Sequence, residues 1–226
     1  MISRVRGADQ AVTHVGENGV SEQLSRIQVK SCPLMMVLSG PSGVGKTTIT
    51  KALVEQGWSG YVVVTATTRR PREGEIDGVH YHFCTHQRFQ SMLQAGELLE
   101  HAEVHGNLYG VPAAPVREQL MANRDVILTI DPQGAQSIRQ HTSGAIFVFI
   151  APESYGDLTS RLDSRGQDSP EQRALRLINA EREMAQMPSY DYIIVNRRER
   201  LQEAVDQLKA IMLAEHCRVD PRCPAV

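Results

Sequence analysis

The sequence predicts an α/β protein built on a parallel sheet that helices cover on both faces. Three observations support this fold class. Short, continuous apolar runs of strand length recur along the chain, helical patterns separate several of them, and the first run ends in a glycine-rich turn that leads into a helical pattern. Strands buried on both faces have this continuous apolar character, and their alternation with helices favours a parallel order.

The expected elements follow in order along the chain. Residues 1 to 32 lack sustained apolar periodicity and are expected to form a flexible N-terminal extension, with one short helix at Val20 to Val29. An apolar stripe from Leu201 to Met212 predicts a closing helix, and the tail beyond it, with Pro221 and Pro224, is expected to be frayed. The expected strands are Leu34 to Leu38, Tyr61 to Thr65, Val126 to Ile130, Ala145 to Ile150 and Tyr192 to Val195.

Length and charge limit the classes of function. The chain has 226 residues, which suits one compact domain with inserted subdomains. Lys and Arg number 24 against 26 Asp and Glu, so the formal charge of −2 gives no broad cationic surface for nonspecific nucleic-acid binding. No apolar run reaches the roughly 18 residues of a membrane span, and nothing resembles a secretory signal. We therefore expect a soluble, cytoplasmic protein without a nucleic-acid or membrane partner.

The cysteines form no recognisable framework. Cys32, Cys84, Cys217 and Cys223 include no CxxC pair, which disfavours a disulfide scaffold. We expect four free thiols in a reducing compartment.

A phosphate-binding loop is the strongest motif. Residues 40 to 47 match Gly-x-x-x-x-Gly-Lys-Ser/Thr between a predicted strand and helix, the context that this motif requires. Its backbone N–H groups and the helix N-terminus form a concave anion site that fits a triphosphate. We expect Lys46 to reach the β- and γ-phosphates and Thr47 to ligate Mg²⁺. The candidate triphosphate-binding residues are Gly40, Pro41, Ser42, Gly43, Val44, Gly45, Lys46, Thr47 and Thr48.

A second phosphate site is suggested after the strand that ends at Thr65. Arg69 and Arg72 lie three residues apart, and Tyr81 follows in a short polar stretch. Two guanidinium groups can clamp a monophosphate, although a pair of arginines taken alone is more often a solvated surface.

Asp131 ends an apolar strand and has two readings. Phosphate-binding enzymes use an acidic strand end to hold Mg²⁺, usually through water, and an Asp before Pro132 can equally be a turn residue. Both readings remain open at this stage.

Five spaced segments together resemble guanylate kinase, a family of nucleoside monophosphate kinases. They are GPSGVGKTT, TTRRPREGEIDGVHYHF, HGNLYG, IDPQGAQ and RLDSRGQDS, and the likeness covers about residues 34 to 212. It implies a P-loop three-layer core at 33–215 with a GMP-binding insert at about 66–115, a lid at about 155–175 and a tail at 216–226. The implied reaction moves the γ-phosphate of ATP to GMP, and by extension to dGMP, to give ADP and GDP in purine metabolism.

The resemblance also assigns roles around the acceptor. It implies that the guanine base meets Thr65 and Glu100, and Glu75 is expected to orient the clamp arginines. Guanine offers two donors on one edge, which one carboxylate can accept together. An alternative without a binding role is that Glu100 is an exposed carboxylate at a helix end in an acidic segment. The residues implied for the acceptor phosphate are Arg69, Arg72, Tyr81 and Tyr109.

The resemblance places three arginines in the lid. Such arginines usually solubilise a helix, but in phosphoryl transfer guanidinium groups on a closing lid stabilise the charge of the moving group and help to exclude water. With Lys46 and Arg72, the implied catalytic set is therefore completed by Arg161, Arg165 and Arg176.

The chain departs from the family pattern at three positions. Thr129, near the acceptor, and Arg197 stand where an acidic residue is usual, and Val111 stands where the family commonly has a hydroxyl. A kinase of another phosphorylated acceptor, such as a sugar bisphosphate, therefore remains an alternative, as does a noncatalytic guanylate-kinase-like binding module. Glu100 argues against the first and the intact loop against the second. A homo-oligomer is left open.

A histidine-rich stretch could in principle ligate zinc. We expect surface residues instead, because Tyr81 is the residue that the family motif uses and alternation sends its neighbours to the opposite face. The stretch contains His80, His82, His86, His101 and His105.

Overall fold

The computed structural model describes residues 32–104, 106–163 and 170–226, with the side chains of 162–163 and 170–176 left out of the description. The predicted helix at Val20 to Val29, His105 and Arg165 therefore lie outside the described residues, as does the side chain of Arg176. Within the described ranges, none of the helices combines the length and apolar character needed to cross a bilayer.

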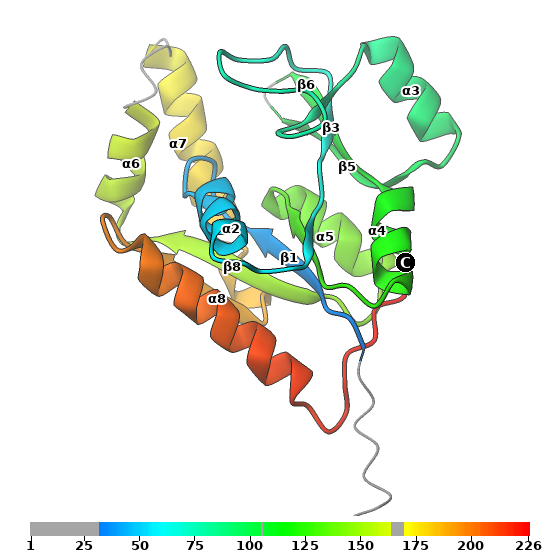
Figure 1. Cartoon of the computed structure of the whole chain (residues 1–226). Coiled ribbons are helices and arrows are strands. Elements are labelled where there is room, and N and C mark those ends of the chain that lie inside the picture. Colours follow the sequence, from blue (N-terminus) through cyan, green and yellow to red (C-terminus); the bar gives the residue numbers. More distant parts are fainter. Residues whose placement is uncertain (1–31, 105, 164–169) are drawn as a thin grey trace, which may run out of the picture. The chain divides into compact units, whose positions relative to one another are not determined.

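The core is a five-stranded sheet in the order β2-β7-β1-β8-β9 (Figure 1). All of its strand pairs are parallel, as the sequence predicts. Its central strand β1 is buried along its whole length. This placement puts the phosphate-binding loop, which follows β1, at the middle of the sheet. The strands are β1 (Met35–Ser39), β2 (Tyr61–Val62), β7 (Val126–Thr129), β8 (Ile146–Pro152) and β9 (Tyr192–Asn196).

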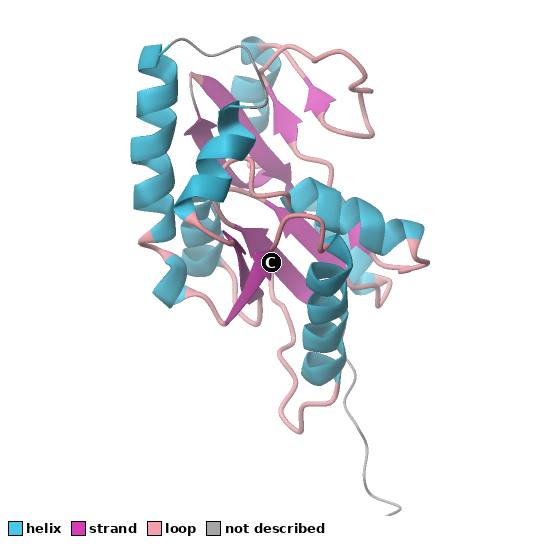
Figure 2. Cartoon of the chain, turned by 90° about the vertical axis from the view of Figure 1, so that its left-hand side faces the viewer, coloured by secondary structure: helices cyan, strands magenta, loops and turns pink. Residues whose placement is uncertain are grey.

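Helices cover both faces of this sheet (Figure 2). Successive side chains of a strand point to opposite faces. Met36 and Leu38 therefore pack toward α2 (Lys46–Glu55) and α8 (Leu201–His216). Met35 and Val37 pack on the other face, toward α4 (Ala113–Met121) and α5 (Pro132–His141). The predicted three-layer architecture is confirmed.

A second, mixed sheet of four strands has the order β4-β3-β6-β5 and was not predicted as such. The strand expected at Tyr61 to Thr65 pairs only as β2, because the chain then leaves the core for this second sheet. The second sheet has a small core of its own around Ala66, Phe89 and Met92. Its elements are β3 (Ala66–Thr67), β4 (His82–Phe83), α3 (His86–Gln94), β5 (Leu98–Val104) and β6 (Asn107–Pro112).

A helical insert follows β8 and consists of α6 (Tyr155–Asp163) and α7 (Pro170–Met184), before the short 3₁₀ helix η1 (Met187–Ser189). Leu158 of α6 packs against Leu177 and Ala180 of α7. In Figure 1 this insert and the second sheet rise on two sides of the same end of the core sheet. This is the carboxyl end of the parallel strands, where open α/β sheets bind their ligands.

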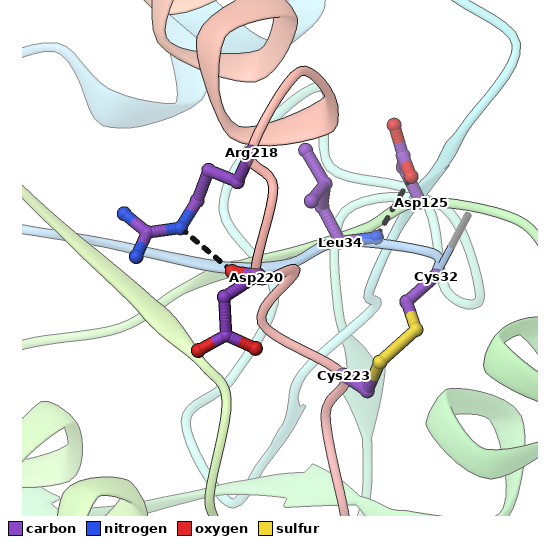
Figure 3. The surroundings of a disulfide bond; sticks show 6 residues. All are labelled: Cys32, Leu34, Asp125, Arg218, Asp220 and Cys223. Carbon is purple, nitrogen blue, oxygen red and sulfur yellow. Dashed lines mark hydrogen bonds between the residues drawn. A yellow bond between two sulfur atoms is a disulfide. The ribbon is translucent and has the colours of Figure 1, made fainter. Parts of the chain in front are cut away.

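The C-terminal tail differs from the expectation of a frayed end. Ala225 pairs with Ser143 in an antiparallel bridge, and Arg222 forms an ion pair with Asp191 at 3.0 Å. Cys223 forms a disulfide with Cys32 at the entrance to β1 (Figure 3).

The expectation of four free thiols is therefore wrong for two of them, while Cys84 and Cys217 are free. The paired residues are 191 positions apart, and their Cα atoms lie 5.3 Å from each other. Sequence spacing cannot reveal such a pair, because the fold alone brings the two chain ends together.

Candidate nucleotide-binding site

The phosphate-binding loop has the backbone that its glycines permit. Gly40, Gly43 and Gly45 have φ angles of 139°, 83° and 99°, which other residues rarely adopt. Lys46 Nζ donates hydrogen bonds to the carbonyl oxygens of Gly40 at 2.6 Å and Pro41 at 3.3 Å. The loop thus carries a positive charge at the N-terminal end of α2, which is the arrangement that binds phosphate.

Two side chains brace this loop through the carbonyl oxygen of Val44. Asn196 Nδ2, at the end of β9, donates to it at 2.7 Å, and Arg161 Nη1, from α6, donates to it at 3.1 Å. Arg161 Nη2 also donates to the carbonyl oxygen of Asn196 at 2.8 Å, and Asp157 pairs with the guanidinium at 2.9 Å. Arg161 thus contacts the phosphate-binding loop, but it lines neither of the two cavities described next.

Two cavities meet at the loop. The smaller, of about 200 Å³, lies between the loop and the second sheet, and the larger, of about 730 Å³, runs along the loop and α2. Both include Ser42, Lys46, Thr65 and Arg72, so groups bound in them would be adjacent. The predicted acceptor residues that line the smaller cavity are Thr65, Arg69, Arg72, Tyr81, Glu100, Tyr109 and Thr129.

Glu75 connects the two clamp arginines. Its Oε1 accepts a hydrogen bond from Arg69 Nη2 at 2.8 Å, and its Oε2 accepts one from the backbone N–H of Arg72 at 2.7 Å. The hydrogen bond between the side chains raises the pKa of Arg69 and lowers the pKa of Glu75. Glu75 therefore fixes the Arg69 guanidinium and the backbone of Arg72, while leaving the Arg72 side chain to other partners.

Aromatic rings complete this wall of the smaller cavity. Arg69 lies over the ring of Tyr81 at 5.2 Å, and the rings of Tyr81 and Tyr109 meet edge to face at 6.0 Å. Burial raises the pKa of Tyr81, so its hydroxyl is a donor at neutral pH. The cavity thus presents guanidinium and phenol donors together, which suits a phosphate.

Glu100 lies on β5 and lines the same cavity. It is only 5% exposed, and its Oε2 has no hydrogen-bond partner within the part of the chain that the structure describes. Burial, together with the nearby negative charge of Asp131, raises the pKa of Glu100 to about 8. The alternative of an exposed helix-end carboxylate is therefore wrong, and a buried acceptor without a donor indicates a ligand that supplies one.

The comparisons with known proteins decide the family. The model of the guanylate kinase family matches residues 33–215. This chain belongs to the guanylate kinase family. A curated guanylate kinase of Clostridium perfringens (strain SM101) is 42% identical over 197 residues, which are 87% of this chain and 90% of that protein. One from Cereibacter sphaeroides is 46% identical over 189 residues, which are 83% of this chain and 89% of that protein.

The fold of this chain is also similar to that of a solved guanylate kinase structure. The crystal structure of guanylate kinase from Anaplasma phagocytophilum has a TM-score of 0.67 and 33% sequence identity, and it covers 84% of this chain and 89% of its own. The predicted resemblance to guanylate kinase and the predicted fold class are both confirmed.

Asp131 caps the helix that follows it. It is the N-cap of α5, and its Oδ1 accepts a hydrogen bond from the backbone N–H of Gly134 at 2.7 Å. The structure thus shows Asp131 as a turn and capping residue, and its role toward Mg²⁺ stays a prediction.

Thr47 and Asp131 are the residues predicted to hold Mg²⁺. Thr47 is exposed in the first turn of α2 and lines the larger cavity. A hydroxyl and a carboxylate are oxygen donors of the kind that Mg²⁺ prefers, so these residues fit the ion.

Glu183 is a cavity residue that sequence reasoning missed. It comes from α7, lines the smaller cavity, and its Oε2 accepts a hydrogen bond from the backbone N–H of Ser42 at 3.3 Å. Burial raises its pKa, and the positive charge of Lys46 opposes that rise. Nothing in the local pattern of this charged helix distinguishes Glu183 from its neighbours.

The three departures from the family pattern have different structural settings. Thr129 lines both cavities. Val111 is fully buried in the core, opposite Glu100 in the ladder between β5 and β6. Arg197 lies 3.9 Å from Glu153 and 3.7 Å from Glu203 at the surface.

The described histidines of the His-rich stretch lie at the surface. No cluster of three or more metal-ligating side chains occurs within the described ranges. The described members are exposed, as expected for surface residues: His80, His82, His86 and His101.

Proposed function

We propose that this protein transfers the γ-phosphate of ATP to GMP and releases ADP and GDP. The observation that carries the proposal is the buried Glu100 carboxylate, whose Oε2 lacks a hydrogen-bond partner among the described residues and which lines a cavity shared with the clamp arginines and the phosphate-binding loop. A base with adjacent donors and a monophosphate would satisfy both ends of that cavity.

On the donor side, the triphosphate of ATP would lie in the loop from Gly40 to Thr48. The backbone N–H groups and Lys46 would hold its β- and γ-phosphates. Thr47 and Asp131 would hold Mg²⁺, the latter partly through water, and the ion would neutralise charge on those phosphates.

On the acceptor side, the phosphate of GMP would meet Arg69, Arg72, Tyr81 and Tyr109. Guanidinium groups bind phosphate oxygens in pairs, and the hydroxyls add single hydrogen bonds. Glu75 would keep Arg69 oriented, as its 2.8 Å contact indicates.

Guanine would be selected by Glu100 with Thr65. Guanine presents N1–H and an exocyclic amine side by side, and both can donate to one carboxylate. Adenine has no such pair, so binding it would leave the buried carboxylate without its donors. The same contacts exist for dGMP, because the base and phosphate are unchanged, and we extend the proposal to it.

The transfer itself needs alignment rather than a strong protein nucleophile. The acceptor phosphate oxygen is already anionic, so the protein must hold the two nucleotides in line and stabilise the charge that spreads over the moving group. Lys46 and Arg72 would act from the cavities. We assign Arg161, Arg165 and Arg176 to the closing lid, where water exclusion would prevent hydrolysis of ATP.

A sugar bisphosphate is a weaker candidate for the acceptor, because it has no pair of N–H groups that could donate to the Glu100 carboxylate. The noncatalytic module is disfavoured by the intact loop and its lysine. Purine nucleotide metabolism and a cytoplasmic location are parts of the proposal that follow from this reaction, and the oligomeric state stays open.

A coupled assay of ADP release tests the proposal. The full chain is incubated with ATP, Mg²⁺ and, in turn, GMP, dGMP, AMP, UMP or no acceptor. We expect turnover with GMP and dGMP, weak turnover with AMP and UMP, and almost none without an acceptor. Turnover with AMP but not with GMP would overturn the assignment.

A further inference from the structure

Gly134 lies in a helix, and its backbone conformation does not require a glycine. It is the third residue of α5, it is buried, and it is not among the glycines with positive φ. Glycine in such a position is less favourable for a helix than alanine, because it gives up more conformational freedom on folding. Something outside the helix must therefore explain the missing side chain.

The Glu100 carboxylate occupies the space that a side chain would take. A Cβ on Gly134 would lie 2.7 Å from Glu100 Oε2, 3.0 Å from Glu100 Cδ and 3.2 Å from Asp131 Oδ1. Contacts below 3.0 Å essentially never occur for real Cβ atoms, so a neighbour would have to shift.

The helix is poorly placed to move away. The N–H of Gly134 is held by Asp131 Oδ1 at 2.7 Å, and the N–H of Ala135 donates to the backbone oxygen of Asp131 at 3.0 Å. One turn later Ile138 is fully buried against the core sheet. The carboxylate of Glu100 is the part that can yield, and the smaller cavity of about 200 Å³ is the space beside it.

We propose that Gly134 is a positioning residue for purine specificity: by lacking a side chain, it lets the Glu100 carboxylate rest on the first turn of α5 and face the base. This inference rests on the proposed function, because it needs Glu100 to read guanine. Gly134 itself touches no substrate in this account and acts only through Glu100.

A purely structural role predicts something different. If Gly134 only allowed close packing of α5, then Gly134→Ala would lower stability and leave the choice between GMP and AMP unchanged. The positioning role predicts a change in the KM for GMP that depends on the presence of the Glu100 side chain.

A double-mutant cycle separates the two roles. Wild type, Gly134→Ala, Glu100→Ala and the double variant are compared for KM and kcat with GMP, AMP and ATP, and for Tm. We expect Gly134→Ala to raise the KM for GMP about tenfold or more, with little change in the KM for ATP. In the Glu100→Ala background the same substitution should change the KM for GMP less than about twofold, because the obstructing carboxylate is gone.

The Tm values give an independent readout. Once the carboxylate is removed, alanine at 134 should raise Tm by about 2 °C through helix propensity. Gly156→Ala is the matched stability control, since Gly156 is also a first-turn helical glycine. Among the described residues, its Cβ would have only Ser154 Oγ within 4 Å, at 3.8 Å. Gly156→Ala should raise Tm by a similar amount in either background.

The outcomes distinguish this inference from the proposed function. An equal rise in the KM for GMP in both backgrounds, or a fall in Tm with unchanged kinetics, would overturn the positioning role of Gly134. If instead Glu100→Ala leaves the ratio of GMP to AMP turnover unchanged, the base assignment of the proposed function fails first.

Discussion

At the scale of single residues, Glu100 combines a cost to folding with a use in binding. It is buried, its pKa is raised to about 8, and its Oε2 lacks a donor among the described residues. A carboxylate in that setting is held ready for a ligand that brings hydrogen-bond donors. Two consequences with opposite signs follow, one for GMP binding and one for stability.

GMP binding should become tighter as pH rises toward 8. Below its pKa, Glu100 carries a proton that must leave before the carboxylate can accept two guanine donors, so affinity falls by up to about tenfold per pH unit. Calorimetry in buffers of different ionisation enthalpy should show close to one proton released per GMP at pH 7 and none well above pH 8. Glu100→Gln is the control, because it lacks this proton and should release none from this site.

The stability of the ligand-free protein should fall as pH rises toward 8, whereas GMP binding becomes tighter. The pKa of Glu100 is higher in the folded protein than in the unfolded chain, so its favourable contribution is fully present below about pH 4.5 and is lost as pH rises through about 8. Glu100→Gln should therefore stabilise the ligand-free protein at pH 8 by on the order of 2 kcal/mol, with little effect at pH 4.5. Thermal unfolding of both proteins at the two pH values measures this, and an equal difference at both would contradict it.

Substitutions of Lys46 and of Arg72 should cause different kinetic defects. Loss of the Lys46 charge should abolish transfer, because the β- and γ-phosphates lose their cation. Arg72→Ala should mainly raise the KM for GMP, by about tenfold or more. Arg70→Ala is the matched control, since Arg70 is exposed and lines neither cavity. Steady-state kinetics with both substrates measure the three variants, and equal defects confined to ATP would contradict the division.

At the scale of elements, the described part of the helical insert is tied to the phosphate-binding loop by Arg161. The guanidinium of Arg161 donates to the carbonyl oxygens of Val44 at 3.1 Å and Asn196 at 2.8 Å. Its position on α6 therefore depends on the conformation of the loop.

Arg161→Ala should lower kcat by about tenfold to 100-fold and raise the KM for ATP, because loop bracing and charge stabilisation are lost together. Arg161→Lys should recover only part of the loss, since one ammonium group cannot reproduce the planar fork. The control is Arg197→Ala, which removes a surface arginine that pairs with Glu153 and Glu203. If steady-state kinetics of Arg161→Ala match wild type, Arg161 has no part in the reaction.

The elements differ in how far the sequence could predict them. The core strands have continuous apolar runs, and the loop has a fixed motif, so the ends of four core strands were predicted to within two residues, whereas β2 ends three residues before the predicted Thr65. The strands β3 and β4 have only two residues each, which is too short for any periodicity. Glu183 and Gly134 were missed for another reason, because their importance lies in contacts with Ser42 and Glu100, which only the folded chain brings near.

At the scale of the whole molecule, a disulfide joins the two ends of the described chain near the start of β1. The disulfide links Cys32 to Cys223, the N–H of Leu34 donates to Asp125 Oδ1 at 2.8 Å, and Arg218 Nε donates to the carbonyl oxygen of Asp220 at 3.1 Å (Figure 3). Cys32 precedes β1, whereas the phosphate-binding loop follows it, so the cross-link and the loop lie at opposite ends of this strand. The cross-link should therefore affect unfolding more than turnover.

Reduction of this disulfide should lower Tm. In the chain-entropy model, a link that closes a loop of this length stabilises by up to about 5 kcal/mol. We expect less, about 2 to 4 kcal/mol or roughly 5 to 10 °C, because the ion pair between Arg222 and Asp191 also holds the tail. Cys223→Ser should reproduce the loss without reductant, whereas Cys217→Ser, at an exposed free thiol, should not.

A count of thiols checks the same link directly. The unfolded, unreduced protein should react at two thiols, those of Cys84 and Cys217. Reaction at four would show that Cys32 and Cys223 are unpaired in the isolated protein.

The fate of the γ-phosphate tests the central claim most directly. The full chain is incubated with γ-labelled ATP, Mg²⁺ and GMP, and the products are separated by chromatography. The account predicts that the label appears in GDP, that GDP and ADP form in equal amounts, and that little inorganic phosphate is released. Label found only in inorganic phosphate, or no labelled GDP at all, would contradict it.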